Sequence, residues 1–170
     1  MLPIPISLDK AKTNKLFYFV ATGIVYRDTD ARCLILKRSV KEVAHPGRWG
    51  VIGGKMEWSD LQSKPPTRMN GNVLDWEGEI ENLIKREAME EAHVMVNDFR
   101  YITSIAFLRP DGVPAVCTKF ACRYVGGDVR VSSDFEDFSW VNESEIRAYP
   151  CIDGIPQEVA AAINLYVVKK

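Results

Sequence analysis

Three glutamates in one short segment have the type and spacing that could carry chemistry. Glu87, Glu90 and Glu91 stand at positions i, i+3 and i+4, so on a helix advancing about 100° per residue they share one arc of its surface. Clustered carboxylate oxygens are the ligands that hard divalent cations such as Mg²⁺ prefer. The alternative is a solvated acidic face that pairs with Lys85 and Arg86. The helix alone leaves both interpretations open.

The segment around these glutamates has the periodicity of an amphipathic helix. It reads EGEIENLIKREAMEEAHVMV from 77 to 96, and its aliphatic residues recur at helical spacing. We expect a helix that ends near His93. Glu87 and Glu91 project between the aliphatic residues, where desolvation and mutual repulsion disfavour them. A positive group is therefore expected beside them.

These residues resemble the Nudix hydrolase family, whose box reads G-x5-E-x7-R-E-U-x-E-E-x-G-U, with U aliphatic. The run REAMEEAHV at 86–94 resembles the tail of the box, and GGKME at 53–57, after GRWG at 47–50, resembles its head. The order of expected strands and helices resembles the family over most of the chain. The resemblance implies an α+β fold, a mixed β-sheet sandwiched between helices (an α/β/α sandwich), formed by a single domain over residues 1–170.

The resemblance also implies a reaction and a role for each site residue. The reaction is hydrolysis of a nucleoside diphosphate linked to another moiety, by attack of water on phosphorus with Mg²⁺ or Mn²⁺ bound. Glu87, Glu90 and Glu91 would hold the metal with the Gly53 carbonyl, and either Glu87 or Glu90 would be the general base. Arg86 would orient a carboxylate of the box.

Other residues are candidates for contacts to the substrate. Guanidinium groups match phosphate oxygens and an aromatic ring can stack on a base. Some family members also use a carboxylate shortly before a strand resembling FSWV. The substrate candidates are Arg38, Arg48, Trp49, Gly54 and Asp137, with Glu136 and Asp134 as alternatives to Asp137.

The sequence departs from the family motif in three places. Gly54 and Arg86 are 32 positions apart where the motif requires 14, which implies an insertion of 18 residues. The Pro- and Asn-rich stretch 58–75 fits it, and we expect an irregular loop there. Asp60 lies at the motif distance from Gly54, but Glu79 opens the helix, and we prefer Glu79 as the first box acid. His93 replaces the glycine that ends the helix at positive φ.

The remaining elements form a mixture of strands and helices without strict alternation. We expect strands at 16–26, 33–38 and 138–141, a short strand running into Gly53, and a hairpin of 99–109 and 115–125 joined by PDGVP. A short helix around Glu145 and a final helix with Pro156 near its first turn complete the chain.

Composition restricts the classes of partner. Lys and Arg number 22 against 23 Asp and Glu, so no strong field favours nucleic acid or an anionic membrane. No apolar run is long enough to span a bilayer and the start of the chain does not read as a secretory signal. We expect a cytoplasmic protein with reduced cysteines, a small-molecule nucleotide as ligand, and a homodimer as a possible assembly.

Two alternatives remain open within the resemblance. The substrate could be a nucleoside triphosphate, ADP-ribose or a nucleotide sugar. The domain could also be a non-catalytic nucleotide-binding or sensor module, which the interrupted box and His93 favour.

Overall fold

A computed structural model describes residues 6–167 of the chain. Its strands are β1 (Tyr18–Arg27), β2 (Arg32–Arg38), β3 (Trp49–Gly50), β4 (Ile52–Lys55), β5 (Arg68–Asn70), β6 (Val73–Asp75), β7 (Met95–Leu108), β8 (Pro114–Gly126) and β9 (Phe135–Val141). Its helices are η1 (Thr13–Lys15), α1 (Trp58–Gln62), α2 (Glu79–Ala92), η2 (Glu145–Ala148) and α3 (Ile155–Tyr166).

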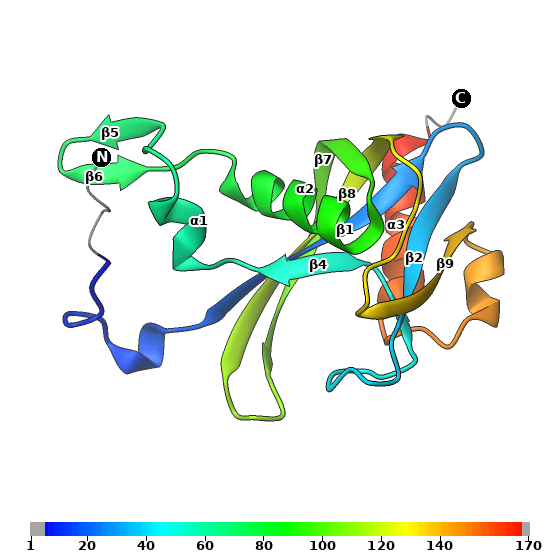
Figure 1. The fold of residues 1–170 in the computed structure, drawn as a ribbon, viewed down its shortest axis with the longest axis horizontal. Helices are drawn as coiled ribbons and strands as arrows, with labels where there is room; N and C mark the ends of the chain where they lie inside the picture. Colours follow the sequence, from blue (N-terminus) through cyan, green and yellow to red (C-terminus); the bar gives the residue numbers. More distant parts are fainter. Residues whose placement is uncertain (1–5, 168–170) are drawn as a thin grey trace.

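Seven strands form one mixed sheet in the order β3-β2-β1-β8-β7, with β4 paired to β1 and β9 paired to β2. The central pair β1 and β8 is parallel, whereas β7 and β8 form the expected antiparallel hairpin. Figure 1 shows this hairpin projecting from the body of the protein. The free edge of the sheet on this side is β7.

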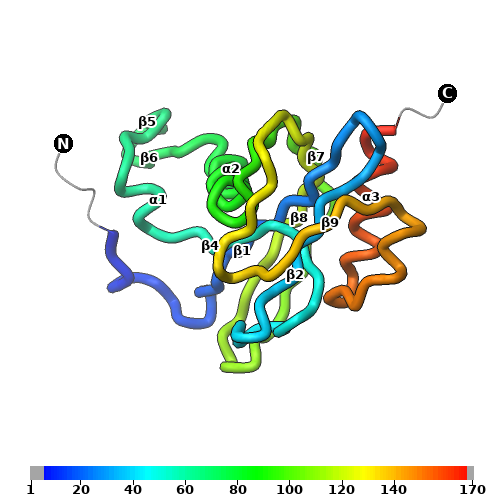
Figure 2. Tube along the Cα trace, turned by 45° about the vertical axis from the view of Figure 1, so that its right-hand side comes forward, coloured from blue at the N-terminus to red at the C-terminus, as the bar shows by residue number. Residues whose placement is uncertain are grey.

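Helices α2 and α3 pack on opposite faces of the sheet (Figure 2). Side chains alternate along β1, since successive residues of a strand point to opposite faces. Ala21 and Val25 pack in the cluster that includes α2, and Ile24 and Tyr26 pack in the cluster that includes α3. The expected α+β architecture, a mixed sheet between helices, is confirmed.

The helix that carries the glutamates ends as predicted. It runs over Glu79–Ala92 and is capped by His93 in the left-handed conformation. The strand at 99–109 begins earlier than expected, at Met95. Among residues 6–167, none of the helices combines the length and apolarity needed to cross a membrane.

The insertion is structured, which corrects the expectation of an irregular loop at 58–75. It contains the short helix α1 and the two-stranded hairpin β5–β6. Glu57 and Asp60 form a capping box at the start of α1. Asn70 pairs with Val73, so the hairpin turns at Gly71-Asn72, with φ +63° at Gly71, and Gly-Asn between two strands is a hairpin signal despite the nearby prolines.

Candidate functional site

Gly54 in β4 lets α2 approach the sheet edge closely. Gly54 pairs with Ala21 of β1, on the face covered by α2. A Cβ on Gly54 would overlap the carboxylate of Glu87. The absence of a side chain here therefore provides the space in which Glu87 sits.

Glu91 lies one helical turn further along the same face of α2. Its Oε2 accepts a hydrogen bond from the backbone N–H of Gly53 at 3.1 Å. Burial raises the pKa of Glu91 to about 8, although the Gly53 bond and the positive charge of Arg38 both lower it, while the charge of Glu87 raises it. The carboxylate of Glu91 is thus desolvated and short of positive charge.

Glu87 shares this environment and Glu90 does not. Burial is the main cause that raises the pKa of Glu87, and the charge of Glu90 adds to it. The side chain of Glu90 is 58% exposed and lies 3.6 Å from the guanidinium of Arg86. The expectation that all three carboxylates converge therefore needs correction, since Arg86 holds Glu90 on the solvent side.

The carboxyl groups of α2 are of a type that binds divalent cations. Their side chains are not grouped as a complete set of ligands. In the part of the chain that the structure describes, no three acidic, His or Cys side chains are grouped closely enough to hold an ion. Glu87 and Glu91, however, present two desolvated carboxyl groups with raised pKa beside Gly53 and Gly54, which the structure places within β4 and not in a loop. A cation bound there would supply the charge that burial makes necessary.

Arg86 contacts an acid from the insertion. Its guanidinium lies 3.5 Å from Asp60 and 3.3 Å from Glu87. Asp60 is fixed in turn, because its other carboxylate oxygen accepts the N–H of Glu57 at 2.8 Å. Glu79, the acid preferred from the sequence, is buried, is paired with Lys64, and accepts a hydrogen bond from Asn82. The geometry thus links Asp60, and not Glu79, to Arg86. The sequence signal for Asp60 was that it lies at the motif distance from Gly54.

A second acid near Glu91 comes from the segment before β9. It is Asp134, whose charge raises the pKa of Glu91. Asp137, the candidate preferred from the sequence, is exposed, accepts the N–H of Phe138 at 2.8 Å, and lies opposite Lys37 in the sheet. Glu136 pairs with Lys37 at 3.0 Å. Of the three acids considered, Asp134 is the one that the structure brings toward the glutamates.

The expected phosphate and base contacts are mostly engaged elsewhere. The guanidinium of Arg38 donates to the Ala44 carbonyl at 2.7 Å and to Glu42 at 2.6 Å. Arg48 is half exposed and lies 3.8 Å from Asp153. Trp49 is only 7% exposed and packs edge-on against Tyr149 in the core beneath α3. Stacking of Trp49 on a base is not supported by this burial.

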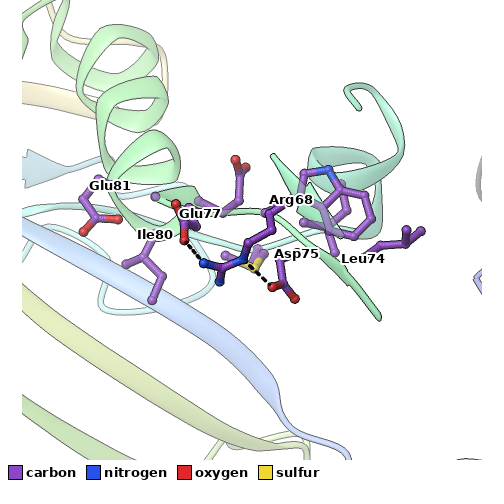
Figure 3. Close-up of a pocket in the computed structure, with 11 residues that line it drawn as sticks. Arg68, Leu74, Asp75, Glu77, Ile80 and Glu81 are labelled. Carbon is purple, nitrogen blue, oxygen red and sulfur yellow. Dashed lines mark hydrogen bonds and ion pairs between the residues drawn. The ribbon is translucent and has the colours of Figure 1, made fainter. Parts of the chain in front are cut away.

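An open cavity of about 530 Å³ lies between the insertion and the start of α2. Figure 3 shows Arg68 at its centre, paired with Asp75 and Glu77, and Ile80 and Glu81 reaching it from α2. The charged groups of the insertion are therefore largely paired with one another. Met56, which follows β4, also lines the cavity, whereas Glu87 and Glu91 do not.

Comparison with known proteins places the chain in a family. The family model of the NUDIX domain matches residues 17–161. No curated protein matches the chain.

Several solved structures share the fold at low sequence identity. The MutT protein of Methanosarcina mazei is 17% identical, with a TM-score of 0.62, over 91% of this chain and 98% of that one. The NUDIX domain of Shewanella oneidensis NrtR, solved with ADP ribose, is 14% identical, with a TM-score of 0.66. The match covers 94% of this chain and 93% of that one. A MutT NUDIX hydrolase of Burkholderia pseudomallei is 20% identical, with a TM-score of 0.63. The match covers 85% of this chain and 97% of that one. The family match over most of the sequence, with this fold and this glycine-glutamate arrangement, shows that the chain belongs to the Nudix hydrolase family.

Proposed function

We propose that this protein is a metal-dependent pyrophosphohydrolase that cleaves a nucleoside diphosphate linked to another moiety. The observation that carries the proposal is the pair of desolvated carboxyl groups, Glu87 and Glu91, beside Gly53 and Gly54 of β4. Two neighbouring carboxyl groups whose burial raises their pKa are costly to keep for structure alone, because neither can ionise freely there. They are useful where a cation and a polyphosphate bind.

Glu87, Glu90 and Glu91 would hold Mg²⁺ or Mn²⁺, with the carbonyl of Gly53 as a further ligand. Bound there, the metal would neutralise phosphate oxygens and lower the pKa of a coordinated water. Arg86 orients Glu87, and Asp60 fixes Arg86 in this role. Either Glu87 or Glu90 accepts the proton of the attacking water, and the weaker burial of Glu90 leaves it the freer of the two to move.

The test is a panel of nucleoside triphosphates, ADP-ribose, nucleotide sugars and dinucleoside polyphosphates, each with Mg²⁺ and with Mn²⁺. We expect metal-dependent release of a nucleoside monophosphate from at least one class, and loss of that activity in Glu91→Gln. Chromatography of the products identifies the bond that is cut. No turnover with either metal, in wild type and variant alike, would overturn the proposal.

The second candidate is a nucleotide-binding module without hydrolysis. It is favoured by the exposed position of Glu90 beside Arg86 and by the NrtR domain, whose structure was solved with ADP ribose. Calorimetry with ADP-ribose separates the two candidates. Binding without turnover under any metal supports the module, whereas metal-dependent turnover supports the hydrolase.

A further inference from the structure

The cavity between the insertion and α2 adjoins the candidate site on one side. Met56, which lines the cavity, follows Gly54 by two residues, or about 7 Å along an extended chain. Ile80, which also lines it, precedes Glu87 by seven residues, or about 10 Å along α2. Its volume of about 530 Å³ is in the range of small-molecule sites. A ligand bound beside Gly54 and Glu87 can therefore extend into this cavity.

Large apolar side chains form part of the lining of the cavity. They are Met56, Leu61, Leu74, Trp76 and Ile80. The indole of Trp76 is fixed in place, because its N–H donates to the carbonyl of Lys64 at 3.2 Å. A tryptophan ring attracts a cation that lies against its face.

The acids of the insertion that line the cavity are only partly neutralised. Asp75 and Glu77 share the single guanidinium of Arg68, each at 3.0 Å (Figure 3). Glu79, at the start of α2, has Lys64 as its own partner. One guanidinium therefore serves two carboxylates on the hairpin side of the cavity.

Glu81 adds a further carboxylate from α2. Among residues 6–167, no cationic side chain lies within ion-pair distance of it. Lys85, one helical turn later, is where a partner would be expected, but its ammonium lies over the ring of Phe99, 5.7 Å from the centroid. The cavity consequently keeps an excess of negative charge beside its apolar lining.

This combination selects the kind of group that fits. The excess of carboxylates repels phosphate, so the phosphates of a substrate stay outside the cavity. A bare metal ion is also disfavoured, because it prefers a shell of oxygen ligands, and in the described part of the chain these acids are not grouped closely enough to hold one. A cation with apolar substituents matches both the carboxylates and the apolar side chains.

We propose that this cavity binds an organic ammonium group, carried by the moiety to which the nucleoside diphosphate of the substrate is linked. This inference rests on the proposed function and deepens it. The ammonium lies against the ring of Trp76 and near the carboxylates of Glu77 and Glu81, and its methyl or methylene groups contact Ile80. The distance from Glu87 is one that a diphosphate and a two-carbon linker can span. The substrate class is a nucleoside diphosphate joined to an amino alcohol or to its N-methylated form.

The test compares two esters that differ in one charge. One is the nucleoside diphosphate ester of choline, and the other is that of 3,3-dimethylbutanol, in which a carbon atom replaces the charged nitrogen. Both are prepared with each of the four bases, and kcat and KM are measured with Mg²⁺ and with Mn²⁺. The ratio of kcat/KM between the two esters reports recognition of the ammonium alone.

Two variants should move this ratio in opposite directions. Glu81→Gln removes a carboxylate that attracts the ammonium, whereas Arg68→Gln removes the guanidinium that competes with it for Asp75 and Glu77. Arg68 is 60% exposed, and exposed ion pairs contribute little to stability, so this variant should fold. The matched control is Glu143→Gln, since Glu143 is exposed and lines a different cavity with Arg147.

We expect wild type to favour the choline ester about tenfold, mainly through KM. The preference should fall to about threefold or less in Glu81→Gln, rise to about thirtyfold in Arg68→Gln, and stay at the wild-type value in Glu143→Gln. The kcat/KM of the neutral ester should be similar in all four proteins. A general loss of folding or catalysis would instead lower the values for both esters together.

Failure of this inference differs from failure of the proposed function. If wild type hydrolyses nucleotides but does not prefer the choline ester, or if Glu81→Gln and Arg68→Gln leave the preference unchanged, the inference is wrong. If wild type hydrolyses nothing, the proposed function is wrong, and calorimetry with free choline and free 3,3-dimethylbutanol still tests the cavity. Binding of choline alone, weakened in Glu81→Gln, supports an ammonium site, and no binding of choline overturns it.

Discussion

The carboxylate of Glu87 occupies the space that a side chain on Gly54 would need. Helix α2 and strand β4 are thus complementary at this point, and the position of Glu87 depends on the absence of a side chain on Gly54. We predict that Gly54→Ala displaces Glu87 and lowers kcat/KM at least about tenfold, since a small misplacement of a catalytic group is costly. Steady-state kinetics with the preferred substrate measures the loss.

Gly50→Ala is the matched control. A Cβ there would meet only the end of the flexible Ile152 side chain, at 3.2 Å. This variant should keep near wild-type activity. Equal activity in Gly54→Ala and wild type would show that the close approach of Glu87 does not matter for the reaction.

Asp60 and Glu79 should have separable roles. Asp60→Asn weakens the contact to Arg86 at 3.5 Å, so kcat should fall about tenfold with little change in melting temperature. Glu79→Gln removes the partner of Lys64, so it should lower the free energy of unfolding by about 1 kcal/mol and leave kcat unchanged. Kinetics and thermal unfolding of both variants provide the measurement. The opposite pattern would restore Glu79 as the first box acid.

Metal binding should stabilise the folded protein through Glu91. At Mg²⁺ about 100 times its Kd, mass action adds about 2.7 kcal/mol, or roughly 5–10 °C in melting temperature. In EDTA at about pH 7, Glu91→Gln should be about as stable as wild type, because burial raises the pKa of Glu91 to about 8 and leaves it largely neutral without a metal, and Mg²⁺ should not raise the melting temperature of this variant. Glu81→Gln, on the same helix, should respond to Mg²⁺ like wild type. Equal shifts in all three proteins would place the metal elsewhere.

Glu145 provides a test of pH dependence away from the site. Its hydrogen bonds with Arg32 lower its pKa from 4.5 to about 2. Since the folded state holds the charged form, the stabilising contribution is present above pH 4.5 and is lost as the pH falls toward 2. The difference in unfolding free energy between wild type and Glu145→Gln should therefore shrink over this range. Urea unfolding at about pH 7, 4 and 2.5 measures it, and a constant difference would contradict the prediction.

His93 adopts φ +59° at the end of α2, a conformation that costs an L-residue about 1–2 kcal/mol. His93→Gly removes this cost, but glycine also has more conformational freedom in the unfolded chain, which cancels part of the gain in stability. We expect His93→Gly to be more stable by about 0.5–1 kcal/mol, with unchanged kcat. An activity gain of more than about tenfold would instead mean that His93 distorts the glutamate helix.

The sequence predicted those features that depend on local periodicity and short motifs. The glutamate helix and its end at His93, the β7–β8 hairpin and the class of fold were all accessible in this way. Contacts between residues far apart in the sequence could not be predicted in this way. The burial of Trp49 and the proximity of Asp134 to Glu91 depend on strand register and on how the chain folds back over α2. A single sequence gives no signal for such long-range pairings.

The insertion was misjudged because two local signals competed. Its prolines favoured a loop, whereas the capping pair Glu57 and Asp60 and the turn at Gly71 specify a helix and a hairpin. The contact of Asp60 with Arg86 brings the two halves of the box together across 18 additional residues.

The base of the insertion is closed, because the indole of Trp76 donates to the carbonyl of Lys64 at 3.2 Å and the N–H of Thr67 donates to the carbonyl of Asp75 at 2.8 Å. Its tip at Gly71 is open, since a Cβ added there would have none of the described residues' atoms within 4 Å beyond its chain neighbours. The tip is consequently a suitable place to graft a fluorophore or an affinity peptide, giving a reporter attached to the protein without touching Glu87, Glu91 or Arg86.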